Sequence, residues 1–224
     1  MQSQAVEDYL KAIYNLLEEG EEEAVATTAL AERLGFAPAS ITNMIKKLAD
    51  LRLVEYKPYQ GVALTEAGQK IALEVIRHHR LMELYLAEAL GVPWDQVHDE
   101  AEKWEHVLSE DLEERIDAAL GYPATDPHGA PIPTREGTIA PVSDVRLTDL
   151  KPGQSALVSQ VNDDDPALLR YLGELGIYPE VEVILIAVAP FDGPLTVRVG
   201  EDEHTMGRKP ADEVFVVNIR EESG

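Results

Sequence analysis

Residues 78–106 read HHRLMELYLAEALGVPWDQVHDEAEKWEH and combine imidazole and carboxylate side chains with Leu, Tyr and Trp. On a helix, side chains three or four positions apart lie on one face, so suitable pairs at that spacing can chelate an ion. Imidazole and carboxylate are the usual protein ligands of first-row divalent metals. Two groups have this spacing: His79 with Glu83, and Glu102 with Glu105 and His106.

A break in the helical pattern at residues 91–94 separates the two groups. Because Gly and Pro end helices, the stretch predicts a helical hairpin with the ligands in its interior. His98 stands at the start of the second helix, where a short connection folds it back toward His79 and Glu83. A solvated helix face is the simpler interpretation of any single pair, but the recurrence of these side chains favours a metal site.

The composition favours a segmented protein without sulfur chemistry. The 224 residues are enough for two to three small cores. Zero cysteines exclude disulfides, thiolate ligands and Cys nucleophiles, and fit a reducing cytoplasm. The acidic N-terminal residues predict neither a signal peptide nor a membrane span.

The negative charge is unevenly distributed along the chain. The formal net charge is -23; residues 1–73 carry 7 Lys and Arg against 11 Asp and Glu, whereas residues 74–150 carry 6 against 17. A field of this sign repels polyanions, so the first third is the part best suited to approach nucleic acid.

The first 73 residues predict three helices and a β-hairpin. Apolar spacing marks a helix over residues 6–17, and Thr27 or Thr28 is expected to cap a short second helix that Gly35 ends. Residues 53–68 alternate apolar and polar side chains around a turn, as a two-stranded wing does. A helix-turn-helix followed by a wing is typical of major-groove readers, with a generic helical hairpin as the alternative.

The third helix begins at Pro38 and has a polar and basic face opposite its apolar stripe. Lysines suit phosphate contacts, whereas short polar side chains suit base edges. The residues predicted to contact DNA are Ala37, Pro38, Ser40, Thr42, Asn43, Lys46, Lys47 and Lys57.

The remaining chain predicts two structured regions joined by an irregular one. Residues 71–120 predict two long amphipathic helices of the kind that dimerise. Residues 121–150 are rich in Pro and Gly and predict a linker or wrapped arm. Beyond residue 150, the runs SALVSQV, VEVILIAVA, LTVRVG and VFVVNI predict strands, and PALLRYLGELG predicts one short helix.

The segment VHDEAEKWEHVLSEDLEERI, together with RHHRLMELYL and EDYLKAIY, resembles the diphtheria toxin repressor family of metal-dependent transcriptional regulators. The resemblance covers almost the whole chain. It implies a mainly α fold with β, built from a winged helix-turn-helix domain at 1–73, a helical metal-binding and dimerisation domain at 74–140, a linker at 141–150 and a C-terminal SH3-like β-barrel at 151–224.

The resemblance also implies two metal sites per subunit. One site corresponds to His79, Glu83 and His98, and the other to Asp8, Glu102, Glu105 and His106. In longer members the barrel lends a ligand to the first site. Asp163, Asp164 and Asp165 stand at about that place, and Asp165 is the closest match, with a helix N-cap as the alternative for Asp164 or Asp165. A second family ligand falls near Leu168, which cannot bind metal.

The metal type follows from two positions. Iron-responsive members resemble this chain but have Met and Cys where it has Asp8 and Glu102, as manganese-responsive members do. Hard oxygen donors favour Mn(II), with Fe(II) next. Short manganese-type members place a Glu one turn after the Asp; Lys11 stands there in this chain, which favours two separated sites.

These features predict a cytoplasmic, homodimeric, metal-activated DNA-binding regulator, not an enzyme. Its expected role is a Mn(II)-dependent repressor of metal-uptake genes on an inverted-repeat operator, with an Fe(II)-dependent regulator of iron homeostasis as the alternative. A metallohydrolase could use the same ligands, but the chain has no HExxH pairing. A winged-helix protein with structural metal would bind DNA whether or not metal is present.

Overall fold

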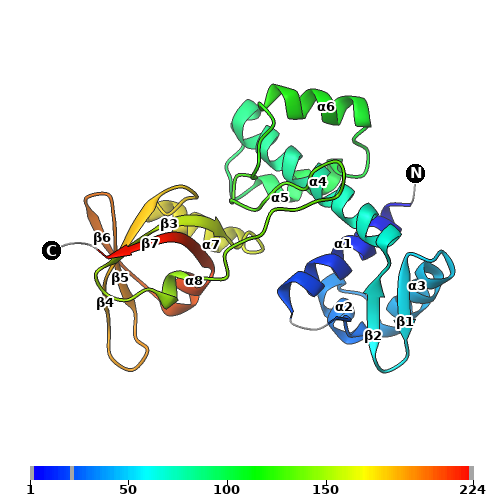
Figure 1. Ribbon diagram of the computed structural model, residues 1–224, viewed down its shortest axis with the longest axis horizontal. Coiled ribbons are helices and arrows are strands. Elements are labelled where there is room, and N and C mark those ends of the chain that lie inside the picture. The colour runs from blue at the N-terminus through cyan, green and yellow to red at the C-terminus, as the bar shows by residue number, and fades with distance from the viewer. Residues whose placement is uncertain (1–2, 21–22, 222–224) are drawn as a thin grey trace. The chain divides into compact units, whose positions relative to one another are not determined.

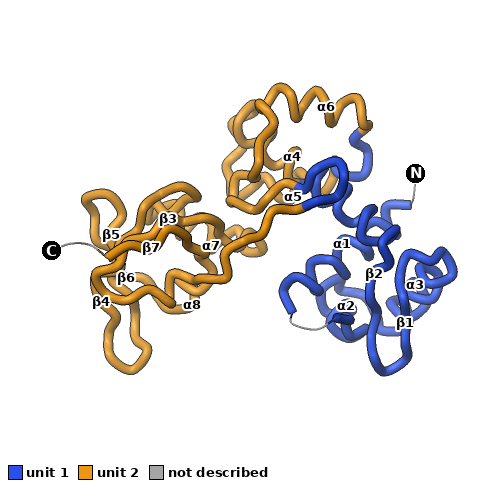
Figure 2. The backbone as a smooth tube through the Cα atoms, viewed as in Figure 1, with its two compact units in different colours: residues 1–79, 105–108, 133–138 blue, residues 80–104, 109–132, 139–224 orange. Residues whose placement is uncertain are grey.

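The protein is described as a computed structural model covering residues 3–20 and 23–221, so the outer ends of the first and last predicted domains lie outside it. Two compact units are present (Figure 2). Unit 1 comprises Met1–His79, Glu105–Leu108 and Pro133–Thr138, and unit 2 comprises Arg80–Trp104, Ser109–Ile132 and Ile139–Gly224. The division runs through α4 (Glu66–Leu90), which is one continuous helix.

Unit 1 contains the predicted winged helix-turn-helix (Figure 1). Its elements before α4 are α1 (Gln4–Glu19), α2 (Thr27–Leu34), α3 (Pro38–Asp50), β1 (Val54–Lys57) and β2 (Gly61–Leu64). The two strands pair antiparallel from Val54 opposite Leu64 to Lys57 opposite Gly61. The core of this unit is made by the apolar faces of the three helices, and its fully buried members include Leu10, Ile13, Leu30, Ile41, Ile45 and Leu48.

The helix ends in unit 1 agree with the sequence except at the start of α2. Gly35 ends α2 in the left-handed region at φ 67°, and Pro38 occupies the first turn of α3. The expected cap by Thr27 or Thr28 is wrong, because the N-cap position is Ala26 and no side chain caps the helix there.

The helical part of unit 2 differs from the predicted pair of long helices. The second helix is divided into α5 (Val97–Trp104) and α6 (Glu110–Ala119). Ser109 starts α6 as its N-cap, with its hydroxyl accepting a hydrogen bond from the Leu112 backbone N–H at 3.3 Å. Glu105 and His106 therefore lie beyond the end of a helix rather than on one.

The C-terminal part of unit 2 is a five-stranded antiparallel sheet in the order β6-β5-β4-β3-β7. Its elements are η1 (Leu147–Asp149), β3 (Gln154–Val161), α7 (Pro166–Glu174), β4 (Glu182–Val188), β5 (Leu195–Val199), β6 (Asp202–Met206), α8 (Arg208–Asp212) and β7 (Val214–Glu221). Apolar side chains from the sheet, including Val158, Leu185 and Val197, pack with Leu169 and Leu172 of α7 in one core.

The Pro- and Gly-rich segment 121–132 is irregular, as predicted, yet it is fixed to β3. The backbone N–H of Val161 donates to the carbonyl oxygen of His128 at 2.9 Å. Gly129 has φ 89°, and a Cβ there would lie 2.1 Å from the carbonyl oxygen of Ser159. Only glycine permits this approach.

Within the described ranges, no helix is long and apolar enough to cross a membrane.

Candidate metal centres

Unit 1 contains a cluster of hard ligands formed by Asp8 of α1 and by Glu105 and His106 of the turn after α5; we call it the α1 cluster. One ligand atom from each residue lies within 4.8 Å of the others. His106 Nε2 is 2.8 Å from Asp8 Oδ1 and 3.3 Å from Glu105 Oε1. Two carboxylates and one imidazole at these separations suit a divalent cation of the Mn(II) or Fe(II) type.

Two residues orient the ligands of the α1 cluster. His106 Nδ1 lies 2.7 Å from Glu7 Oε2, so this carboxylate accepts the Nδ1 proton and leaves Nε2 facing Asp8 and Glu105. Such a carboxylate behind a ligating imidazole fixes both its tautomer and its direction. His78 Nδ1 is 3.1 Å from the carbonyl oxygen of Glu105 and holds the turn against α4. Sequence reasoning missed Glu7, whose only signal was its position beside Asp8.

A lysine lies at the centre of the same arrangement. Lys11, about one turn after Asp8 on α1, donates from Nζ to Glu105 Oε2 at 2.8 Å and to Oε1 at 3.1 Å. Its Nζ is also 3.2 Å from His79 Nδ1, which in turn lies 2.5 Å from Glu105 Oε2. The Glu105 side chain is fully buried. The ammonium of Lys11 therefore compensates a carboxylate that would otherwise be costly to bury.

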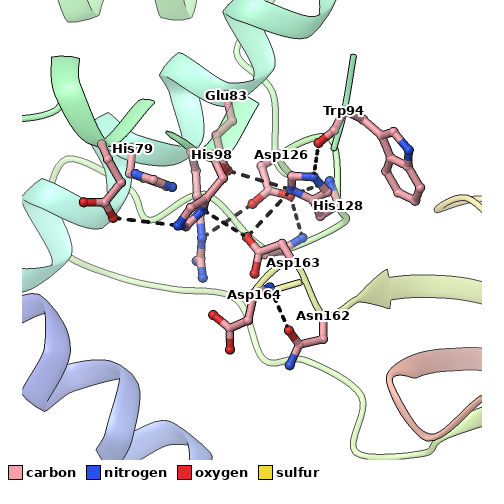
Figure 3. A network of polar contacts seen from close by, with 12 residues as sticks. His79, Glu83, Trp94, His98, Asp126, His128, Asn162, Asp163 and Asp164 are labelled. Atoms are coloured by element: carbon pink, nitrogen blue, oxygen red, sulfur yellow. Dashed lines mark hydrogen bonds and ion pairs between the residues drawn. The ribbon is translucent and has the colours of Figure 1, made fainter. Parts of the chain in front are cut away.

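Unit 2 contains a second cluster, made by Glu83 of α4, His98 of α5, His128 of the 121–132 segment and Asp163 after β3; we call it the β3 cluster (Figure 3). His98 Nδ1 is 3.2 Å from Glu83 Oε1 and 3.9 Å from Asp163 Oδ2. His128 Nδ1 is 3.9 Å from Glu83 Oε2 and 3.7 Å from the same Asp163 oxygen. Two imidazoles thus converge on two carboxylates.

Asp126 lies beneath the β3 cluster and shapes the segment that carries His128. Its Oδ1 accepts hydrogen bonds from the backbone N–H groups of His128 at 2.8 Å and Ala130 at 2.9 Å. Burial, followed by the negative charge of Glu83, raises the pKa of this carboxyl from 3.8 to about 7. Arg80 offsets part of that shift from 3.7 Å.

The other residues expected to bind metal are placed as follows. His79 and Glu83 are one turn apart on α4, His79 in unit 1 and Glu83 in unit 2. Glu102 has Oε1 3.9 Å from His98 Nε2, one turn away on α5. Asp165 caps α7, because its Oδ1 accepts from the Ala167 N–H at 2.8 Å. Of the three aspartates at 163–165, it is Asp163 rather than the closest family match, Asp165, whose carboxylate reaches the β3 cluster.

The predicted DNA-contacting face of α3 is accessible. Ile41, Ile45 and Leu48 point into the core, whereas Ser40, Asn43, Lys46 and Lys47 are exposed. Thr42 is half-buried and donates its hydroxyl to the carbonyl oxygen of Pro38 at 2.9 Å. Lys57 is exposed at the end of β1. Two residues further on, at the wing tip, is Tyr59, an exposed aromatic residue that sequence reasoning did not single out.

A winged helix-turn-helix whose first helix contributes to a cluster of metal ligands defines a class of protein, the metal-dependent DNA-binding regulators. Comparison with known families supports this class along the chain. Residues 1–62 match the iron dependent repressor N-terminal DNA binding domain, and residues 65–134 match the iron dependent repressor metal binding and dimerisation domain. Residues 145–218 match the FeoA domain.

Individual relatives match over nearly their whole length. The chain is 33% identical to the iron-dependent repressor IdeR of Mycobacterium tuberculosis, over 95% of this chain and 96% of that protein. A solved manganese-dependent transcriptional repressor in complex with manganese is 37% identical, with a TM-score of 0.85 over 95% of this chain and 99% of that one. The repressor ScaR with bound Zn²⁺ is 28% identical, with a TM-score of 0.78 over 95% and 98%.

The chain belongs to the diphtheria toxin repressor family of metal-dependent transcriptional repressors and carries a C-terminal FeoA domain. The predicted fold class is confirmed, and the matched domains imply DNA and a second copy of the chain as partners. The family consists of divalent-metal-binding repressors rather than enzymes, so the metallohydrolase alternative is wrong.

Proposed function

We propose that the protein is a Mn(II)-dependent repressor of metal-uptake genes that acts in the cytoplasm as a homodimer on an inverted-repeat operator. Fe(II) is the alternative effector, because relatives named as iron-dependent and manganese-dependent repressors match the chain similarly well. The proposal divides the chain at residues 73, 140 and 150 into the DNA-binding domain, the dimerisation domain, a linker and the C-terminal domain.

The donor atoms of the α1 cluster are the observation that supports Mn(II) as the effector. Asp8 offers a carboxylate in the first helix, and the chain contains no cysteine that could supply a thiolate. Oxygen and imidazole donors suit Mn(II), whereas sulfur donors suit softer ions. In this proposal one site consists of Asp8, Glu102, Glu105 and His106, and the other of His79, Glu83 and His98 with a carboxylate of the 163–165 loop.

Linkage between metal and DNA follows from the elements that carry the ligands. Asp8 lies on α1, which packs against α2, and α2 packs against α3. Glu105 and His106 lie in a turn far along the chain. An ion held by all three favours the arrangement in which they converge. The ion binds this arrangement more tightly than one in which the ligands are apart. This difference in affinity shifts the population toward one placement of α3.

The test is an operator-binding titration with promoter fragments of metal-transporter genes. Binding is measured with Mn(II), with Fe(II) under anaerobic conditions, and with a chelator. We expect tight binding in Mn(II), loss of binding in chelator, and a symmetric footprint with half-sites about one helical turn apart or a multiple of it. DNA affinity that ignores metal would contradict the proposal, and activation by Fe(II) alone would favour the alternative.

The proposed DNA surface has its own test at Lys47. If this exposed side chain neutralises one phosphate, Lys47→Ala lowers affinity for every sequence and reduces the slope of log K against log salt by about one unit. Lys209→Ala, which removes an exposed lysine of α8, is the matched control and should change neither quantity. An unchanged salt slope in Lys47→Ala would remove this residue from the interface.

A further inference from the structure

The side chain of Trp94, in the turn between α4 and α5, packs against the core of the FeoA domain. Its ring centroid lies 4.6 Å from that of Tyr178, in the loop after α7, and 5.6 Å from that of the His128 imidazole. The Trp94 carbonyl oxygen accepts a hydrogen bond from His128 Nε2 at 2.8 Å (Figure 3). Trp94 therefore joins three segments that are far apart in the sequence, a role that the sequence did not predict.

The helix α7 leaves room for this aromatic pair. Gly173 lies inside α7, where glycine is less favourable than alanine because it loses more backbone freedom on folding. A Cβ at this position would lie 3.3 Å from Trp94 Nε1 and 2.8 Å from the hydroxyl oxygen of Tyr178. The same hydroxyl lies 3.4 Å from the carbonyl oxygen of Gly173. A side chain here would displace one ring or both, so the glycine serves the contact rather than the helix.

An ion pair lies beside the aromatic contact. Arg170 of α7 donates from Nη1 to Oδ2 of Asp95 at 3.0 Å, and Asp95 is buried whereas Arg170 is largely exposed. A pair with one exposed partner adds little stability. Its direction is specific, however, because a charge on one surface selects the placement of the opposite charge on the other. The pair therefore fixes how α7 lies on the turn before α5.

Both sides of this contact continue directly into the β3 cluster. Asp95 stands three residues before His98, near the start of α5, and α7 begins at Pro166, three residues after Asp163. His98 Nδ1 lies 3.9 Å from Asp163 Oδ2. A fixed α7 thus keeps the loop that carries Asp163 close to the helix that carries His98.

We propose that Trp94, Asp95, Arg170, Gly173 and Tyr178 form a latch that docks the FeoA domain on the helical part of unit 2 without a metal ion, and so positions the β3 cluster. The latch acts by position alone, since its residues belong to none of the groups of described residues that could hold an ion. Ligands held together beforehand bind an ion more tightly, because less ordering remains to be done on binding. This second step rests on the proposed function in taking the β3 cluster as a metal site.

The first test is ¹⁵N relaxation of the full-length protein in chelator, which reports how fast each part of the chain tumbles. We expect the amides of β3–β7 in the parent to share the correlation time of α4–α6. Gly173→Leu places a side chain where the indole lies, while leucine favours a helix more than glycine does, so α7 itself is not weakened. This variant should lose the shared correlation time, and Glu174→Leu, at the adjacent exposed position, should keep it. Independent tumbling of β3–β7 in the parent, or shared tumbling in Gly173→Leu, would overturn the latch.

The ion pair is tested by two substitutions of one residue. Arg170→Glu places a like charge beside the buried Asp95 and should release the domain in chelator. Arg170→Lys keeps a cation there and should leave the domain docked. Release in both variants, or in neither, would remove the ion pair from the latch.

Isothermal titration with Mn(II) tests the effect on the β3 cluster. Gly173→Leu changes no ligand, yet it should weaken one class of bound ion by about tenfold, as the loss of a residue that supports metal ligands does. Glu174→Leu should bind like the parent. At saturating Mn(II) the shared tumbling of Gly173→Leu should return, because the ion favours the docked state that holds it. Unchanged Mn(II) affinity in Gly173→Leu would contradict the positioning role.

This inference and the proposed function fail separately. If Gly173→Leu releases the domain and weakens Mn(II) binding but operator binding ignores metal, the proposed function alone is wrong. If operator binding needs metal while the FeoA domain of the parent tumbles independently in chelator, the latch alone is wrong.

Discussion

The α1 cluster and the β3 cluster combine the same two kinds of side chain but differ in how their carboxylates are compensated. In the α1 cluster, Lys11 places an ammonium 2.8 Å from Glu105, the buried carboxylate. In the β3 cluster, the carboxylates of Glu83 and Asp163 face the imidazoles of His98 and His128, and Nδ1 of His128 has no hydrogen-bond partner within residues 3–20 and 23–221. An ion entering the α1 cluster must compete with the ammonium of Lys11, whereas the contacts described for the β3 cluster pair its carboxylates with imidazoles.

This difference predicts different affinities and different consequences for stability. A resident ammonium lowers the affinity for a divalent ion, because like charges repel strongly where water is largely excluded. When no metal is bound, removing this ammonium would leave the buried carboxylate of Glu105 without its compensating charge. The α1 cluster is therefore suited to respond within a range of metal concentration, and the β3 cluster to hold its ion more continuously.

Removing Asp8 should have the largest effect. Asp8→Ala deletes the α1 cluster's ligand from the first helix, so operator affinity in Mn(II) should fall by about 100-fold, near the upper end of ordinary allosteric coupling. The Tm without metal should stay close to that of the parent, because the Asp8 side chain is 38% exposed. Fluorescence anisotropy measures the affinity, with Asp99→Ala as the control. Full Mn(II)-dependent binding by Asp8→Ala would assign the switch to the β3 cluster.

Changing the donor atoms should alter metal choice rather than abolish binding. In Asp8→Met with Glu102→Cys, two sulfur donors replace two oxygens of the proposed site, so activation should move from Mn(II) toward Fe(II). The measurement is the half-saturating concentration of each ion for operator binding under anaerobic conditions. An unchanged ratio would show that these two positions do not set the selectivity.

Replacing Lys11 tests the charge difference itself. Lys11→Met should bind Mn(II) at the α1 cluster about tenfold more tightly, since a charge with only 12% side-chain exposure is removed. Without metal the same variant should unfold at lower temperature, because Glu105 stays buried without its cation. Isothermal titration and thermal unfolding give the two readouts. Lys103→Met, at an exposed pair with Glu100, is the control, and unchanged values in both readouts would contradict the comparison.

The smallest effect concerns Asp126, whose carboxyl lies beneath the β3 cluster. Its pKa is 3.8 for the unperturbed group and about 7 in the fold, so between these values the native state binds more protons and stability falls as pH rises. Asp126→Asn keeps an oxygen for the N–H groups of His128 and Ala130 but cannot ionise. In chelator, its Tm should exceed that of the parent by a few degrees at pH 8 and converge with it near pH 4. A pH-independent difference would contradict the shift.

Periodicity accounts for what the sequence predicted correctly about the fold. Apolar residues at a spacing of three or four define α1 and α3, and alternation defines β1 and β2, because one face of each is buried. β6 was missed because four of its five residues are polar and only Met206 is fully buried. The division between α5 and α6 was missed although its signal is local: Ser109 precedes acidic residues, and its hydroxyl accepts from the Leu112 N–H three residues on.

Periodicity also separates the metal ligands that the sequence predicted from the one that it did not. Asp8, His79 and Glu83 lie on helices, where spacing specifies a face. His128 lies in an irregular segment whose path depends on the positive φ of Gly129 and on one backbone hydrogen bond to β3. No repeat in the sequence encodes that path, so the approach of His128 to Asp163 became visible only in three dimensions.

The hydrogen bond from Val161 to the carbonyl oxygen of His128 has a practical consequence. Exchange of the Val161 amide proton with solvent requires this bond to open, which separates the 121–132 segment from the end of β3. An ion held by residues on both sides would slow that opening in proportion to its saturation. The Val161 amide is thus a natural isotope-exchange probe of metal occupancy, one that needs neither DNA nor a substituted residue.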